Sequence, residues 1–262
     1  MVYPDIEVEI LIAAYDAERT IEACIESIFL DTRGVKFRVL LFDDGSRDKT
    51  CQIVEAMKDE RIRIIRNAGR VGLPGALNHL VSVSTAPFLA RMDADDLMMN
   101  NRLATQLNFL KNNSDVDVCG TFAQARSGTP GTLLTRPLGH KRCVEFLSRS
   151  TPFLHPTVLA RRHFFVDNAY SNAFLRAQDW ELFSRTIQAY RFANIPIVGL
   201  DYEVSAGLSI SGLKYKLWAG ILAAVRTRRP AGLFMVVSDV SRNLLSLIYK
   251  QCGRRLRRAW MF

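Results

Sequence analysis

Short apolar runs and segments of helical periodicity alternate along the first part of the chain. Four apolar runs predict β-strands, each with a polar turn at its end: EVEILIAAY, FRVLLFDDGS, RIRIIRN and PFLARMDADD. Between them, apolar residues recur every three or four positions, as Ile21, Cys24 and Ile25 do. They predict helices in DAERTIEACIESIFLDT, SRDKTCQIVEAMKD and GLPGALNHLVSVS, with Asp16 as the N-cap of the first. This β-α-β-α-β-α-β order predicts an α/β protein with a doubly wound, mostly parallel sheet.

The rest of the chain has a weaker pattern. DVDVCGTFAQ predicts a further strand, and the Gly-, Pro- and Thr-rich segment RSGTPGTLLTRPLGHKR predicts a loop that could act as a mobile lid. FLHPTVLARRHFFVDNAY is typical of a short strand with turns. AQDWELFSRTIQAY predicts a helix that begins at an Asp, and the chain has no evident internal repeat.

Polar residues cluster where three of the predicted strands end: at Ala14–Asp16, at Asp43–Ser46 and at Asp93–Asp96. In open parallel sheets, ligands bind outside the carboxyl ends of the strands. We therefore expect these three segments to meet on one rim of the sheet and to form the functional site there.

The acidic turn after the fourth predicted strand holds three carboxylates, on Asp93, Asp95 and Asp96. Like charges this close repel, so one of them should be pushed toward protonation unless a cation compensates. One interpretation is a site for Mg²⁺ or Mn²⁺, which prefer carboxylate, water and phosphate oxygens. The other is a solvated turn that caps a helix, because Asp is favoured at N-caps. The motif alone leaves both open.

Three further segments offer polar candidates, each with a structural alternative. In FDDGSRDKT, Asp43 or Asp44 could accept hydrogen bonds from a nucleobase or ribose, although the Gly and Ser also explain a turn. Asp179, next to Trp180, could have a raised pKa and act as a base, or it could be an N-cap. His155 precedes a Pro, and a lone His is more often structural than functional.

The length of 262 residues and the 48% hydrophobic composition fit one globular domain with an appendage, large enough to fold without disulfides. The five cysteines are odd in number, widely spaced and without a C-x-x-C pair (Cys24, Cys51, Cys119, Cys143 and Cys252). We therefore expect reduced thiols and a cytosolic environment. The segment MVYPDIEVEILIAAYD has no basic region at its start and predicts a strand rather than a signal peptide.

The net charge of +9 is concentrated at the carboxyl-terminal end. Residues 213–262, the basic tail, carry 11 Lys and Arg against one acid, Asp239, so the tail has a formal charge of +10 and residues 1–212 have −1. Its apolar stretch from Ala231 to Tyr249 contains Asp239 and Arg242, which argues against a bilayer-spanning helix.

A cationic amphipathic helix on an anionic membrane surface is the favoured interpretation of the basic tail. The alternative is a pair of helices that packs on the body of the protein with a solvated basic face. Nucleic-acid binding is disfavoured, because the arginines accompany a long apolar face rather than exposed aromatic platforms.

Five segments together resemble the inverting nucleotide-sugar glycosyltransferases of family 2, which have the GT-A fold with its Rossmann-like sheet. They are ILIAAYDAERTIEACIESI, LLFDDGSRDKT, GLPGALNHL, RMDADDLMMNNRL and QDWELFSR, in the family's order, over residues 6–190. The chain departs from the family pattern at Asp16, where Asn is common, and at Asn100, where Pro is frequent. It also has Gln178 where an acid is frequent, which leaves Asp179 as the main candidate for the base.

The resemblance implies a role for each matching residue. Nucleotide binding is implied for Ala13, Tyr15, Asp43, Asp44, Gly72, Asn78, Asp93 and Asp95. Asp95 would also be the ligand of the Mn²⁺ or Mg²⁺ ion that bridges the diphosphate. Asp179 would take the proton of the acceptor hydroxyl as that oxygen attacks the anomeric carbon in one inverting displacement. Weaker candidates for contacts to the sugar or acceptor are Asp96, His155 and Trp180.

We therefore expect a metal-dependent enzyme that moves a sugar from a nucleotide sugar, by preference a UDP-sugar, to a lipid-linked oligosaccharide or a lipopolysaccharide or capsule precursor. It would be peripheral on the cytoplasmic face of the inner membrane, with residues 1–110 as the nucleotide-binding half of the catalytic domain and 111–212 as the acceptor half. One alternative is a nucleotidyltransferase of similar fold, although AAYDAERT supplies no Gly-rich phosphate loop. The other is a non-catalytic nucleotide-sugar sensor at the membrane.

Overall fold

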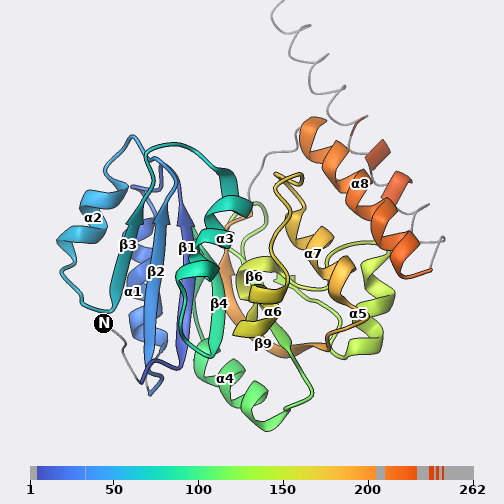
Figure 1. The fold of residues 1–262 in the computed structure, drawn as a ribbon, viewed down its shortest axis with the longest axis horizontal. Helices are drawn as coiled ribbons and strands as arrows, with labels where there is room; N and C mark the ends of the chain where they lie inside the picture. The colour runs from blue at the N-terminus through green and yellow to red at the C-terminus, as the bar shows by residue number, and fades with distance from the viewer. Residues whose placement is uncertain are drawn as a thin grey trace, which may run out of the picture.

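The computed structural model describes residues 5–32, 34–204, 210–228, 236–238, 240, 241 and 244. Its first part alternates strands and helices in the predicted order (Figure 1). The elements are β1 (Val8–Ala14), α1 (Ile21–Asp31), β2 (Phe37–Asp43), α2 (Thr50–Ala56), β3 (Ile62–Arg66), α3 (Gly72–Val83) and β4 (Phe88–Asp93). The strands and helices predicted for this part are confirmed. The predicted N-cap is wrong, because α1 begins only at Ile21 and Asp16 lies in the preceding turn with a φ of 49°.

The second part has more elements than the sequence pattern indicated. They are β5 (Leu97–Met98), α4 (Arg102–Asn112), β6 (Val118–Ala125), β7 (Leu133–Leu134), α5 (His140–Leu147), the 3₁₀ turn η1 (His155–Thr157), β8 (Leu159–Arg161), α6 (Arg162–Asp167), α7 (Gln178–Thr186), β9 (Phe192–Tyr202) and α8 (Ile210–Arg226). β6 and α7 confirm the strand and the helix predicted there. The segment expected to be a strand with turns also contains α6, because Phe164 and Phe165 are buried in the core. The expected loop at 126–142 includes β7 and the start of α5.

The strands of the described residues form one sheet with the order β3-β2-β1-β4-β8-β6-β9-β5, and β7 pairs with β6. β3, β2, β1 and β4 are parallel, β8 runs antiparallel to both β4 and β6, and β6 and β9 are parallel again. The predicted α/β fold with a mostly parallel, doubly wound sheet is confirmed. β1 and β2 are buried almost throughout, because helices cover both faces of the sheet.

Two hydrophobic clusters lie on opposite faces of this sheet. On β1, Ile10 and Ile12 belong to the cluster that includes α1 and α4, and Leu11 belongs to the cluster that includes α3, α6 and α7. Arg38, which interrupts the apolar residues of β2, forms an ion pair with the buried Glu9 across the β1–β2 ladder. Glu9 also accepts two backbone N–H groups from the α3–β4 connection, so its buried charge is compensated.

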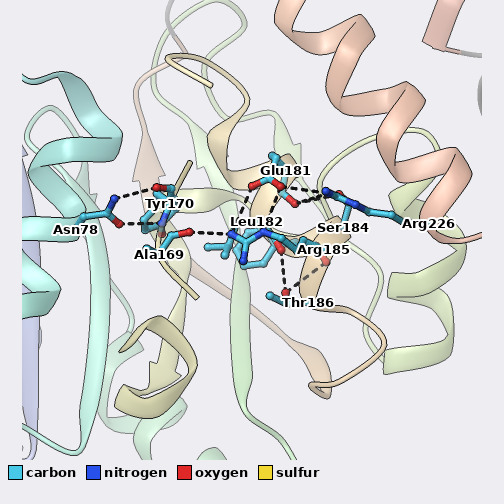
Figure 2. A network of polar contacts seen from close by, with 10 residues as sticks. Asn78, Ala169, Tyr170, Glu181, Leu182, Ser184, Arg185, Thr186 and Arg226 are labelled. Atoms are coloured by element: carbon cyan, nitrogen blue, oxygen red, sulfur yellow. Dashed lines mark hydrogen bonds and ion pairs between the residues drawn. The ribbon is translucent and has the colours of Figure 1, made fainter. Parts of the chain in front are cut away.

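The described part of the basic tail packs on the body of the protein. In α8, Ala219 is fully buried, and a Cβ atom added at Gly220 would lie 3.2 Å from the ring of Trp180. Figure 2 shows the polar anchor of the helix, in which Arg226 of α8 pairs with Glu181 of α7 at 3.2 Å. Of the two interpretations of the tail, packing on the body therefore holds for α8.

Other predictions for the tail fall mainly outside the described residues. These are the ones for Ala231–Tyr249 and for the arginine-rich end of the chain. Among the described helices, none has the length and apolar character needed to cross a bilayer. Four of the five cysteines are free thiols as predicted (Cys24, Cys51, Cys119 and Cys143), and Cys252 lies outside the described residues.

Candidate active site

The carboxyl ends of β1 and β4 open into a cavity of about 830 Å³, as expected for an open parallel sheet. Four sequence candidates line it: Ala13, Tyr15, Asp93 and Asp95. The turn that follows β1 and three arginines complete much of the wall (Arg19, Arg47 and Arg70). We call it the strand-end cavity.

One wall of the strand-end cavity is a stacked pair, with the guanidinium of Arg70 3.8 Å from the ring centroid of Tyr15. Asp44 holds the loop that carries this arginine. Its two carboxylate oxygens accept the backbone N–H groups of Val71 at 2.7 Å and of Gly72 at 2.9 Å. Asp44 is buried and is not among the described residues that line the cavity. It therefore contributes to the cavity indirectly, by holding the loop that carries Arg70.

Three more of the nucleotide candidates also lie outside the lining of the cavity. Asp43 accepts the backbone N–H of Ser46 at 3.0 Å. Asn78 donates to the carbonyl of Tyr170 and accepts its N–H, both at 2.8 Å, and so joins α3 to the segment before α7 (Figure 2). Gly72 opens α3 with a φ of +77°, a conformation that favours glycine. The structure therefore gives these residues contacts within the protein.

The carboxylates of Asp93, Asp95 and Asp96 gather at the end of β4, with one oxygen of each within 4.8 Å of the others. The pKa of Asp96 is raised to about 8. Burial of the carboxyl is the main cause, and the negative charge of Asp93 is the second. Burial also raises the pKa of Asp95. The repulsion expected from the sequence is present, and Asp96 is the carboxylate pushed furthest toward protonation.

This acidic cluster does not cap a helix. The turn leads into β5, and Asp31 caps the next helix, α4, by accepting the N–H groups of Asn101 and Arg102. One carboxylate oxygen of Asp96 is buried and has no hydrogen-bond partner among the described residues. Three hard oxygen donors, one of them unpartnered, fit Mg²⁺ or Mn²⁺ better than a solvated capping turn.

A second cavity, of about 530 Å³, lies next to the first, and we call it the α7 cavity. Asp179, Trp180 and His155 are among the residues that line it. Leu73 and Asp93 line both cavities. Two molecules bound in the two cavities would therefore meet at Asp93.

Asp179 lies in the first turn of α7, and the N-cap of that helix is Ala177. The alternative that Asp179 is an N-cap is therefore wrong. Burial raises the pKa of Asp179, while the N–H of Trp180, donated to the carboxylate, and the charges of Arg91 and Arg136 act against this shift. A carboxylate with a raised pKa in a cavity can take a proton from a bound hydroxyl.

His155 and Trp180 line the α7 cavity, but their polar atoms bond within the protein. Nε2 of His155 lies 2.9 Å from the hydroxyl of Tyr170, and burial holds the pKa of His155 well below its usual value. Nε1 of Trp180 donates to the carbonyl of Leu147 at 2.8 Å. The structural interpretation of His155 fits these contacts, and Trp180 offers its ring to the cavity.

The cations of the site were not predicted from the sequence. Arg91, on β4, is buried and forms an ion pair with Asp93, and two of its nitrogens have no partner among the described residues. A signal for it existed, because an arginine inside an apolar strand is unusual. Four more cations line the α7 cavity and belong to no motif: Arg136, Arg149, Arg176 and Lys216.

Comparison with known proteins relates this site to a large family. Residues 9–169 match the family described as Glycosyl transferase family 2. The Escherichia coli UDP-Glc:alpha-D-GlcNAc-diphosphoundecaprenol beta-1,3-glucosyltransferase WfgD is 36% identical over 257 residues, which span 94% of this chain and 90% of WfgD. The putative glycosyltransferase EpsE of Bacillus subtilis is 31% identical over 160 residues, and this match spans 59% of the chain but only 56% of EpsE.

Solved structures share the fold at low sequence identity. TarS 1–349 of S. aureus in complex with UDP-GlcNAc has a TM-score of 0.68 and 15% identity, over 87% of this chain and 70% of TarS. The mannosyltransferase PcManGT of Pyrobaculum calidifontis, in complex with GDP-Man and Mn²⁺, has a TM-score of 0.65 and 15% identity, over 98% of this chain and 84% of PcManGT. These likenesses confirm the GT-A arrangement of sheet and helices. Since the family match covers more than half of the chain and WfgD is similar along nearly all of it, the protein is a glycosyltransferase that belongs to glycosyl transferase family 2.

Proposed function

We propose that the protein transfers a sugar from a UDP-sugar to a lipid-linked saccharide, with inversion of the anomeric configuration. The observation that supports this most directly is the junction of two cavities at Asp93, with the acidic cluster on one side and Asp179 on the other. The strand-end cavity would take the nucleotide sugar and the α7 cavity the acceptor. Residues 1–110 would then supply most of the donor half, and 111–212 most of the acceptor half.

Asp95, together with Asp93, is proposed to hold Mg²⁺ or Mn²⁺. Bound there, the ion would offset the negative charge that develops on the departing diphosphate. Arg91 pairs with Asp93 from within the sheet and fixes the direction of that carboxylate at the junction of the cavities. The stacked Tyr15 and Arg70 would form the wall against which the nucleoside lies.

Asp179 is proposed as the catalytic base. Its carboxylate, oriented by the N–H of Trp180, would take the proton of an acceptor hydroxyl as that oxygen attacks the anomeric carbon. Attack and departure on opposite faces of one carbon invert its configuration. The only other carboxylate among the described residues that line the α7 cavity is Asp93, which Arg91 already engages.

The names of two relatives support the donor and acceptor classes. WfgD and WfaP of Escherichia coli are both named as UDP-Glc:alpha-D-GlcNAc-diphosphoundecaprenol beta-1,3-glucosyltransferases. WfaP is 26% identical over 222 residues, which span 80% of this chain and 81% of WfaP. The same substrate classes, a UDP-sugar and a lipid diphosphate carrying a saccharide, are the ones we propose for this protein.

We further propose that the protein acts at the cytoplasmic face of the inner membrane through its basic tail. On α8, Trp218, Ile221 and Val225 are 54%, 39% and 71% exposed and share one helix face by their spacing. The exposed Lys214 and Arg228 flank them. An apolar stripe between cations suits an anionic lipid surface. Full-length protein should co-sediment with vesicles of anionic lipid, and Trp218→Ser should bind them less; no binding by the unmodified protein contradicts the proposal.

A transfer assay tests the proposed function. The purified protein is incubated with UDP-sugars, Mn²⁺ and a GlcNAc diphosphate lipid, and nucleoside diphosphate and glycan product are measured. Acceptor-dependent release of UDP, with an inverted anomeric configuration in the product, is the expected result. Binding of nucleotide sugar without release would favour the sensor, and formation of nucleotide sugar from nucleoside triphosphate would favour the nucleotidyltransferase. Either result contradicts the proposal.

A further inference from the structure

The α7 cavity has more positive than negative side chains. The cations in its lining are Arg91, Arg136, Arg149, Arg176 and Lys216, and the carboxylates are Asp93 and Asp179. Arg91 is committed to Asp93. Within the part of the chain that the structure describes, the other four cations form no ion pair with a carboxylate.

These four cations come from separate parts of the sequence. Arg136 lies between β7 and α5, Arg149 follows α5, Arg176 precedes α7, and Lys216 is on α8. Arg136 is half-buried, whereas the other three side chains are exposed. The helices α5, α7 and α8 contact one another and lie on the same side of the molecule (Figure 1). The fold thus gathers charges that the sequence keeps apart.

Such a gathering is unfavourable on its own, because like charges repel. A bound anion would compensate it. Guanidinium groups bind phosphate oxygens in bidentate pairs, and an ammonium group binds them as a point charge. Apolar side chains line the same cavity as well (Leu175, Leu213, Val236 and Val240). A ligand that joins a phosphate group to an apolar chain matches both parts of this lining.

We propose that Arg149, Arg176 and Lys216, the cationic cluster, bind the diphosphate of the acceptor, a lipid diphosphate that carries a saccharide. The saccharide then reaches Asp179, and the apolar chain leaves the cavity beside α8. This inference deepens the proposed function and rests on it. On this proposal, the protein recognises the acceptor by its diphosphate group, which a neutral glycoside lacks.

The diphosphate of the donor is a poorer match for the cationic cluster. The three side chains of the cationic cluster line the α7 cavity and are absent from the described lining of the strand-end cavity. The strand-end cavity has cations of its own, namely Arg19, Arg47 and Arg70, and lies at the acidic cluster proposed to hold the metal ion. The two diphosphates of the reaction thus have separate sets of cations.

A pair of double variants tests this assignment. Arg176→Gln/Lys216→Gln removes two charges from the cationic cluster. The matched control, Lys141→Gln/Arg142→Gln, removes two charges from α5 at positions outside the described lining of both cavities. All four side chains are exposed, so neither variant leaves a buried group unpaired. The probes are a short-chain alkyl GlcNAc diphosphate, the matching neutral alkyl GlcNAc glycoside, and UDP with Mn²⁺, each titrated by calorimetry.

The cluster variant should bind the diphosphate probe about 10- to 100-fold more weakly than the unmodified protein, because charge-assisted hydrogen bonds are lost. Its preference for the diphosphate probe over the neutral glycoside should fall to the same degree, and the control should keep that preference. An unchanged affinity in the cluster variant, or an equal loss in the control, overturns the proposal. A parallel loss of UDP affinity would assign these cations to the donor and overturns it too.

The salt dependence of probe binding is a second test, and it uses the unmodified protein. Raising the ionic strength should weaken binding of the diphosphate probe more than binding of the neutral glycoside, and an equal effect on both contradicts the proposal. These titrations contain no sugar donor, so they separate two failures. If no nucleotide sugar is turned over but the diphosphate preference holds, the proposed function alone fails. If transfer occurs without that preference, only the cationic cluster fails.

Discussion

The two cavities that meet at Asp93 differ in how the chain builds them. The described lining of the strand-end cavity lies within residues 13–95, at the ends of β1 and β4 and in the segments that follow the four parallel strands β1, β2, β3 and β4. The α7 cavity draws on side chains from Leu73 to Val240, spread over loops and several helices. Family motifs mark residues of both cavities, such as Asp95 and Asp179, whereas four cations of the α7 cavity belong to no motif (Arg136, Arg149, Arg176 and Lys216). The family match itself covers 9–169 and ends before Asp179.

The largest effect should come from the acidic cluster of the donor side. Asp95→Asn, or exhaustive removal of divalent metal with EDTA, should lower the rate of transfer about 1,000-fold or more, because the charge of the leaving diphosphate is no longer offset. Acceptor-dependent UDP release measures it. Asp115→Asn is the control, since Asp115 is exposed and pairs with Arg191 at the surface. Full activity after EDTA treatment would contradict the role of Asp95.

A stability effect should come from the anchor on the acceptor side. Glu181 has a side chain only 5% exposed and pairs with Arg185 and Arg226 (Figure 2). Glu181→Ala should lower the free energy of unfolding by about 2 kcal/mol, since the two arginines lose their charge-assisted hydrogen bonds to a buried carboxylate. Glu55→Ala breaks an exposed pair with Arg66 and should cost less than about 1 kcal/mol. Urea denaturation compares the two, and equal losses would count against the anchor.

The pH dependence of transfer should report Asp179. Burial raises its pKa although Arg91 and Arg136 oppose the shift, so the carboxylate can accept a proton only above that raised value. The rate at saturating metal should therefore fall about tenfold per pH unit on the acid side, with a midpoint above the usual range of aspartate. A pH–rate profile measures it. A midpoint in the usual range of aspartate would show that another group controls the rate.

The same burial predicts that Asp179→Asn stabilises the folded protein. The folded state has the higher pKa at this carboxyl, so it binds the proton more tightly than the unfolded state does. The stability that the protonated Asp179 contributes to the folded protein is therefore lost as the pH rises through the raised pKa. Asn cannot ionise, so the variant should melt at a higher temperature than the unmodified protein at neutral pH, and the gap should narrow as the pH falls. An equal or lower melting temperature at neutral pH is the contrary result.

The smallest effect should come from the stacked wall of the strand-end cavity. Arg70→Ala removes the guanidinium from the ring of Tyr15 and should raise the Kd for UDP about two- to fivefold, the range of an exposed cation–π contact. Arg63→Ala, at an exposed position on β3 outside the described cavity linings, is the matched control. Titration with UDP measures both. If the two variants bind UDP equally, the stack does not contribute.

The sequence predicted the elements of residues 1–110 well for a physical reason. The strands there are nearly continuous apolar runs and the helices have one apolar face, so local pattern and tertiary burial agree. The position of the strand-end cavity followed from the predicted order of parallel strands, because their carboxyl ends lie at one edge of the sheet. The role implied for Asp44 stays a prediction, and its observed contacts to Val71 and Gly72 could not be foreseen, because they depend on how the loop before α3 folds back.

The elements of residues 111–212 were predicted less completely. β9 carries a Pro, an irregular burial pattern and register shifts against β6, so it lacks the alternation that marks a strand. β5 has two residues, too few for any periodicity. Asp179 was found through its motif, but Arg149, Arg176 and Lys216 become neighbours only through the packing of α5, α7 and α8.

The division of labour between the two cavities is tested most directly by measuring transfer and donor binding together in Asp179→Asn. The account predicts that transfer falls about 100- to 10,000-fold, the usual contribution of a general base, because the acceptor hydroxyl keeps its proton. Donor affinity should stay within about twofold of the unmodified protein, since Asp179 is outside the described lining of the strand-end cavity. Transfer near the original rate, or loss of donor binding in step with transfer, would contradict the account.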